Sequence, residues 1–188
     1  ALRSMLSKVG LDGQTDLRVI ETSFSNMLPM LEDDKIDAGP IVQPLASQMV
    51  EAGKYKALFS SADAIGPTQF VFLVASTSFL EKNPDAAKDF MEDHVRGYRW
   101  ITDPANRDEA LPIIAEASVR PVEQMSYLFT DIDYFRDPYL VPNIEGLQLA
   151  IDASAKLGVV PRAIEIDPDY VDLSLVEEAK RRIEADPK

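Results

Sequence analysis

The chain has 188 residues, of which 46% are hydrophobic and 27% are charged, a composition that is ordinary for a globular protein. Its formal net charge of −13 argues against nucleic acid or an anionic membrane surface as a partner, because both bind through fields of lysine and arginine. It has no cysteine, which excludes disulfides, thiolate metal sites and cysteine nucleophiles.

The first nine residues predict a helix, because Leu2, Met5, Leu6 and Val9 recur on one helical face. No Ser, Thr, Asp or Asn precedes this pattern as an N-cap, so we expect the chain to begin inside an element of a longer protein. Gly10 is well placed to end this helix.

Residues 17–75 alternate between short apolar runs and helical patterns. The helical patterns predict helices over 23–34 and 44–51. The apolar runs predict four strands, at Leu17–Thr22, Ile36–Val42, Tyr55–Ser60 and Phe70–Ala75. Strands that alternate with helices in this way predict βαβ units and a mainly parallel sheet.

Beyond residue 76 the pattern becomes helical throughout. Helices are expected over 83–102, 107–117, 122–129, 144–157 and 175–185. The predicted fold class is therefore α/β, with one α/β lobe followed by a largely helical C-terminal half.

Motifs that would carry catalysis or hold a metal are missing from the sequence. The sole histidine, His94, lies in the middle of a predicted helix, and no serine-hydrolase elbow, phosphate-binding loop or zinc-protease motif occurs. Asp131, Asp133 and Asp137 lack the glycine and the later glutamate of a calcium loop, which favours a solvated acidic turn. We therefore expect no catalytic residue, no metal and no cofactor.

Two predicted strand ends are candidates for ligand binding. In open α/β sheets, ligands lie beyond the carboxyl ends of parallel strands and against helix N-termini, which points to residues 22–27 and 39–44. Gln43 offers both a donor and an acceptor, and Gly39 lets a ligand or another backbone segment approach closely. The alternative is that these are turn and cap residues without a ligand, and the spacing alone leaves both interpretations open.

Several segments occur together in a recognisable order. They are L-R-x-x-L-x-x-x-G-L-D at 2–12, S-F-S-N-M at 23–27, K-I-D-A at 35–38, Gln43-Pro44, F-L-V-A-S-T-S-F-L-E-K-N-P at 72–84, G-V at 158–159 and Y-V-D-L-S at 170–174. With this order the chain resembles the type 2 periplasmic solute-binding proteins. It is most similar to the branch that serves ABC importers of sulfonates, nitrate, taurine and pyrimidine precursors, which usually has Glu-Pro where Gln43-Pro44 stands.

The resemblance implies a periplasmic-binding-protein-like fold of two lobes. Residues 1–66 would form most of an α/β second lobe, 67–76 a hinge crossing and return strand, and 77–188 the helical part of the first lobe. The family's opening strands would lie upstream of Ala1, and an isolated fragment would expose sheet edges that favour self-association. The residues expected to bind the solute are Ser25 and Asn26 on a loop beside the cleft, Gly39, Gln43 and Pro44 at the cleft rim, and Thr68, Gln69 and Phe70 at the hinge.

The function that the resemblance implies is that of a periplasmic or otherwise extracytoplasmic receptor, not an enzyme. It would close on a small-molecule solute and present it to the membrane permease of an ABC importer. A neutral Gln43 in place of Glu favours an anionic or neutral polar solute. Two alternatives stay open: a ligand-sensing domain of a signalling protein, and a pyrimidine-synthesis enzyme of the same fold, which the lack of cysteine and the single histidine disfavour.

Overall fold

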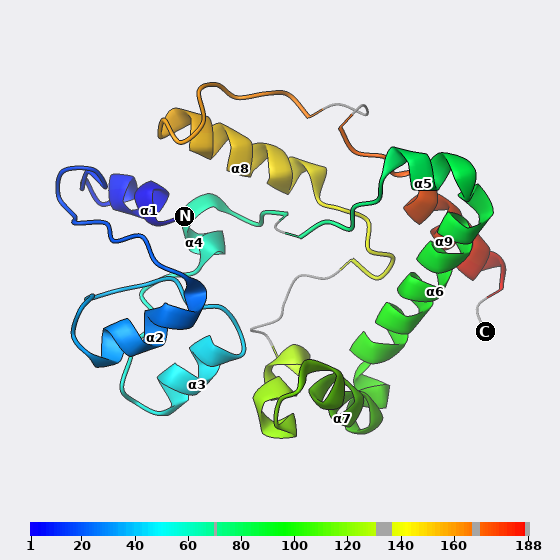
Figure 1. Cartoon of the computed structure of the whole chain (residues 1–188), viewed down its shortest axis with the longest axis horizontal. Coiled ribbons are helices and arrows are strands. Elements are labelled where there is room, and N and C mark those ends of the chain that lie inside the picture. Colours follow the sequence, from blue (N-terminus) through cyan, green and yellow to red (C-terminus); the bar gives the residue numbers. More distant parts are fainter. Residues whose placement is uncertain (70, 131–136, 167–169, 187–188) are drawn as a thin grey trace.

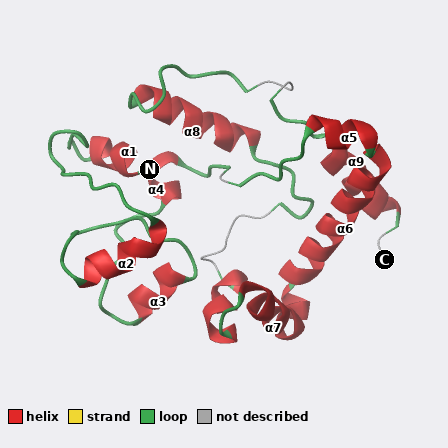
Figure 2. Ribbon diagram, in the orientation of Figure 1, coloured by secondary structure: helices red, strands yellow, loops and turns green. Residues whose placement is uncertain are grey.

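The computed structural model describes residues 1–69, 71–130, 137–166 and 170–186. Within these ranges the chain consists of helices joined by loops, without a β-strand (Figures 1 and 2). The α-helices are α1 (Leu2–Lys8), α2 (Phe24–Glu32), α3 (Leu45–Glu51), α4 (Ser61–Ile65), α5 (Thr77–Lys82), α6 (Pro84–Thr102), α7 (Arg107–Ser118), α8 (Ile144–Lys156) and α9 (Ser174–Ala185). Two 3₁₀-helices, η1 (Pro104–Asn106) and η2 (Val122–Phe129), flank α7.

The predicted α/β fold class is wrong for the described part of the chain. The segments 17–22, 36–42, 55–60 and 71–75 have no regular secondary structure, and Phe70, which would open the last of these strands, lies outside the described residues. A strand exists only where its N–H and C=O groups pair with a neighbouring strand, and no such ladder forms here. The apolar side chains of the expected buried strand instead face solvent, with Val71 72% and Val74 86% exposed.

The helices predicted from periodicity are confirmed. The patterns over 1–9, 23–34, 44–51, 83–102, 107–117, 144–157 and 175–185 correspond to α1, α2, α3, α6, α7, α8 and α9, with ends that differ by a few residues. The pattern over 122–129 forms the 3₁₀-helix η2. Helices α4 and α5 and the single turn η1 were not predicted.

Helices α6 and α9 pack along each other and form the best buried part of the structure (Figure 1). Val95 and Ala179 are fully buried between them, and Ile183 is 4% exposed. Met91 and Tyr139 pack against the edge of this cluster. The Tyr139 ring also receives two cations on its faces, since the Arg99 guanidinium carbon lies 4.7 Å from the ring centroid and Lys180 Nζ lies 5.2 Å from it.

A network of charged side chains joins the same two helices along one edge. Arg182 of α9 donates hydrogen bonds to Asp89 (2.9 Å) and Glu92 (3.1 Å) of α6 and to Glu178 (2.8 Å) of its own helix. These hydrogen bonds raise the pKa of the Arg182 guanidinium above its ordinary value. Hydrogen bonds from Arg96 and from Arg182 lower the pKa of Glu92 below its ordinary value of 4.5.

A second apolar cluster lies where α7 packs against η2. Leu111, Ala115 and Met125 are each 3–5% exposed, and Leu128 and Phe129 pack against them. Because Val119 after α7 adopts a left-handed conformation with φ of 53°, the chain turns back sharply enough for η2 to reach α7.

A third group of contacts joins α1, α4 and α8, which lie on the side of the structure away from α6 and α9 (Figure 1). Helix α4 begins with a capping box, in which the Ser60 side chain accepts from the Asp63 N–H and the Asp63 carboxylate accepts from the Ser60 N–H. Gly146 of α8 allows the backbone at Pro67 to approach, because a Cβ at position 146 would lie 2.6 Å from the Pro67 carbonyl oxygen. None of the described helices is long and apolar enough to cross a membrane.

Candidate functional site

Gln43 and Pro44 lie at the start of α3, joined by a cis peptide bond. The Gln43 Oε1 atom accepts hydrogen bonds from the Ser47 N–H (3.2 Å) and from the Ser47 hydroxyl (2.9 Å). Within the described residues the Gln43 side-chain nitrogen has no hydrogen-bond partner. Gln43 thus caps α3 through its oxygen and keeps one amide donor pair for another partner.

The predicted residues of the first strand end lie on or near α2. Ser25 and Asn26 are exposed in its first turn, where the Ser25 and Ser23 hydroxyls are 2.8 Å apart. Gly39 lies against the same helix, since a Cβ there would be 2.9 Å from Met27 Sδ. The group that approaches Gly39 is therefore a side chain of α2, whereas a ligand or a backbone segment was expected there.

Thr68 and Gln69 lie in the segment that reaches the start of α8. Gln69 Oε1 accepts from the Asn143 N–H (2.8 Å), and Gln69 Nε2 donates to the Val71 carbonyl (2.6 Å). Both ends of this side-chain amide therefore fix the backbone, whereas Thr68 is partly buried beside it. Phe70, predicted to bind the solute with them, lies outside the described residues.

No hydrogen bond within the described residues joins these three groups into one site. The structure brings Gly39 to α2, and it keeps Gln43 at α3 and Gln69 at α8. The role of all eight residues in solute binding therefore stays a prediction.

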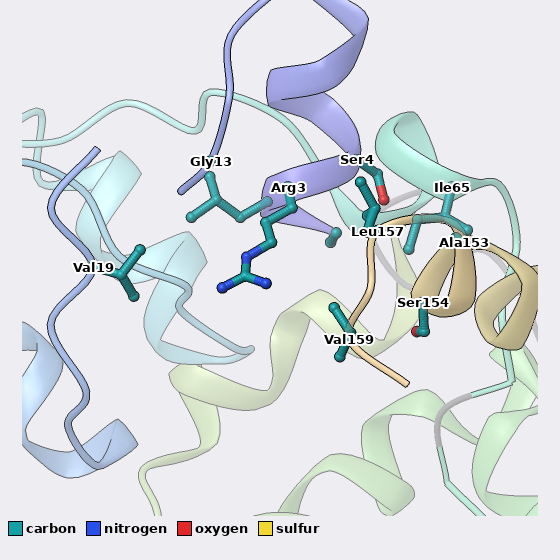
Figure 3. Close-up of a pocket in the computed structure, with 11 residues that line it drawn as sticks. Arg3, Ser4, Gly13, Val19, Ile65, Ala153, Ser154, Leu157 and Val159 are labelled. Atoms are coloured by element: carbon teal, nitrogen blue, oxygen red, sulfur yellow. The ribbon is translucent and has the colours of Figure 1, made fainter. Parts of the chain in front are cut away.

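A hollow of about 280 Å³ lies between α1, the end of α4 and the end of α8 (Figure 3). Its walls are mainly aliphatic and come from segments far apart in sequence: Leu2, Val19, Ile65, Ala153, Leu157 and Val159. The polar side chains that line it are those of Arg3, Ser4 and Ser154. None of the eight residues predicted to bind a solute lines it.

The sequence predicts one wall of this hollow, the apolar face of α1, but it does not predict which segments form the other walls. The amphipathic pattern of residues 1–9 places Leu2 and Leu6 on an inward face, but it does not show that residues 153–159 lie opposite. Contacts between segments about 150 residues apart leave no trace in local periodicity.

Ser154 also borders a second, wider hollow of about 540 Å³, formed by α8 and the segment after it. Ile151, Val160 and Ile164 contribute apolar surface there, and Arg162 lies at its rim. The Gln148 side chain holds the segment in place, since Gln148 Nε2 donates to the Ile164 carbonyl (3.0 Å) and Gln148 Oε1 accepts from the Ile166 N–H (2.9 Å).

Within the described residues, no three His, Cys, Asp or Glu side chains are grouped so that they could hold a metal ion. His94 is exposed and stacks on Phe90, with 5.8 Å between the ring centroids. Two of the three acidic residues considered for a cation, Asp131 and Asp133, lie outside the described residues. The third, Asp137, accepts hydrogen bonds from the N–H groups of Tyr139 and Val141.

Comparison with known proteins gives one finding that bears on function. The model of the NMT1-like family matches residues 1–115, which is more than half of the chain. This range includes α1 to α6 and most of α7, together with the segments over 2–84 that carried the resemblance described above, but not those at 158–159 and 170–174. No curated protein and no solved structure matches the chain. The chain therefore belongs to the NMT1-like family, which is periplasmic-binding-protein-like and associated with the binding of small solutes.

Proposed function

We propose that this protein is the extracytoplasmic substrate-binding component of an ABC-type importer. It binds a small polar or anionic organic solute of the sulfonate, nitrate, taurine or pyrimidine-precursor kind, and it delivers that solute to a membrane permease without transforming it. The single observation that supports this proposal best is the match to the NMT1-like family over residues 1–115.

The side chain of Gln43 supports the preference for an anionic or neutral solute. A glutamate at this position would add a negative charge that could pair with an amine, whereas Gln43 keeps the neutral amide and has its nitrogen available as a donor. The strong negative charge of the chain, −13, makes long-range attraction of an anion unfavourable. Selectivity for an anion must therefore come from donors at short range.

The proposal is tested by titrating the protein with taurine, an alkanesulfonate, nitrate and a pyrimidine precursor, with binding followed by calorimetry. We expect at least one of these solutes to bind with measurable heat and to raise the melting temperature. If none of them binds, the proposed function is rejected.

The role of Gln43 is tested with Gln43→Glu, which preserves the oxygen that accepts from Ser47 and adds one negative charge. We expect affinity for an anionic solute to fall about tenfold or more, because like charges a few ångströms apart repel by more than 1 kcal/mol near a protein surface. Gln124→Glu on η2 is the matched control, since it makes the same charge change elsewhere. Equal affinity of the two variants would remove Gln43 from the site.

A further inference from the structure

We infer that the hollow between α1, α4 and α8 binds a small monoanionic oxyacid, a carboxylate or sulfonate, that carries a short aliphatic chain. The anionic head would lie at the Arg3 guanidinium and the chain against the aliphatic walls. This inference goes beyond the proposed function, because the residues predicted for the transported solute do not line this hollow.

The first observation is that the Arg3 guanidinium has no protein partner within the described residues. The guanidinium extends into the open space of the hollow, toward neither Ser4 nor Ser154 (Figure 3). Arg3 makes no ion pair and no hydrogen bond within the described residues, whereas Arg96, Arg181 and Arg182 each pair with glutamate. Arg3 is partly buried as a residue, and its guanidinium offers five donors without a protein acceptor, which suits an oxyanion bound in a bidentate manner.

The second step is the way in which the stem of Arg3 is held. A Cβ at position 13 would lie 2.9 Å from Arg3 Cγ and 3.6 Å from Arg3 Cβ, so the stem passes directly over Gly13. Within the described residues, neither carboxylate beside Gly13 pairs with the guanidinium. Asp12 accepts from the Gln14 N–H (2.7 Å), and Asp16 accepts from the Asp12 N–H (2.8 Å). The guanidinium is therefore held at the hollow by packing and not by a charge partner.

The third step is the lining, which explains why the ligand needs an apolar body. Seven aliphatic side chains, that of Ala1 among them, form most of the wall, and no acidic side chain within the described residues lines the hollow. An ammonium group on the ligand would have no partner there, whereas each methylene that becomes buried strengthens binding about fourfold. A volume of about 280 Å³ is slightly below the range of drug-sized pockets and suits a ligand of a few carbons.

A serine beside the arginine provides a further donor. The Ser4 Oγ atom is buried without a hydrogen-bond partner within the described residues, whereas the Ser154 hydroxyl already donates to the Ala150 carbonyl (2.7 Å). A buried hydroxyl without a partner is unfavourable. Rotation of the Ser4 side chain toward the hollow would relieve this state when a ligand oxygen is present.

The experiment measures binding of four probes by ligand-observed NMR: pentanoate, acetate, 1-butanol and butylamine. Pentanoate has both features, acetate has the charge alone, 1-butanol has the chain alone, and butylamine has the chain with the opposite charge. We expect pentanoate to bind at least tenfold more tightly than each of the other three. Equal binding of pentanoate and acetate, or of pentanoate and 1-butanol, would overturn the inference, and so would no binding of pentanoate.

Variants then assign the binding to Arg3. Arg3→Gln should weaken pentanoate binding about tenfold or more, and Gly13→Ala should weaken it as well because it displaces the Arg3 stem without changing the charge. Arg120→Gln, which makes the same charge change after the end of α7, should bind as the unchanged protein does. Full pentanoate binding by a folded Arg3→Gln variant would overturn the inference, and a folded state is verified by its circular dichroism.

The outcome is independent of the proposed transport function. Gln43→Glu should leave pentanoate binding unchanged, and Arg3→Gln should leave binding of taurine or nitrate unchanged. If pentanoate fails to bind while taurine or nitrate binds, the inference falls and the proposed function stands. If pentanoate binds at Arg3 while taurine, nitrate and the pyrimidine precursor all fail to bind, the inference stands without the proposed function.

Discussion

The contact between α6 and α9 makes a quantitative prediction about stability. Val95 is fully buried at the centre of this contact, against Ala179 and Ile183. The substitution Val95→Ala removes two carbon atoms from this position and introduces no polar group. It therefore measures how much the packing of these two helices contributes to the free energy of unfolding.

The expected magnitude follows from burial and helix propensity. Deleting one buried methyl-sized group costs about 0.5–1.5 kcal/mol including the cavity that remains, so two groups cost about 1–3 kcal/mol. Alanine is favoured over valine in a helix by about 0.5 kcal/mol, which offsets part of this loss. We expect Val95→Ala to lower the free energy of unfolding by about 0.5–2.5 kcal/mol, or the melting temperature by about 1–10 °C for a chain of this length.

The assay is urea denaturation followed by circular dichroism, with Val74→Ala as the matched control. Val74 is 86% exposed, so the same substitution there should change stability by less than about 0.5 kcal/mol. The reasoning is refuted if Val95→Ala costs no more than Val74→Ala. In that case α6 and α9 would not form the core that the structure shows.

Two further predictions concern charge and backbone approach. Hydrogen bonds from Arg96 and Arg182 lower the pKa of Glu92 in the folded state. The ionised Glu92 carboxylate therefore stabilises the folded state fully above the ordinary pKa of 4.5, and this stabilisation is lost as the pH falls below that value. Arg182→Gln should make the urea midpoint less dependent on pH below 5, and an unchanged acid profile would contradict this. Gly146→Ala should destabilise the protein, because the new Cβ would lie 2.6 Å from a backbone oxygen, whereas Gly97→Ala has open space and should be neutral or stabilising in thermal melts.

The helices could be predicted from the sequence because their signal is local. The apolar positions of α6 recur every three or four residues over 19 residues, and Asn83-Pro84 marks its start. Helix α4 was missed although its capping box, Ser60 with Asp63, is present in the sequence. Its five residues are too few for a periodic pattern, and they directly follow a run that reads as a strand.

The strands were predicted wrongly because an apolar run specifies an extended backbone but not a partner. The run F-V-F-L-V-A over 70–75 has the composition of a strand buried on both faces. In the structure, residues 71–75 of this run have no regular secondary structure and are exposed, since no segment within the described residues pairs with them. Strand pairing depends on segments distant in sequence, and neither the composition nor the period of a single segment contains that information.

Polar side chains at predicted sites must also be separated into those that already serve the local fold and those that remain available to bind a ligand. The rule that ligands lie at strand ends selected Gln43, yet the structure shows that its oxygen already serves Ser47 in the cap of α3. Arg3 has no such local role, because every hydrogen-bond donor of its guanidinium is without a protein acceptor in the described residues. A guanidinium without a protein acceptor can offer all of its donors to an oxyanion. Side chains whose hydrogen-bonding capacity the fold leaves unused are therefore the better candidates for ligand binding, and within the described residues Arg3, the Ser4 hydroxyl and the side-chain nitrogen of Gln43 are of this kind.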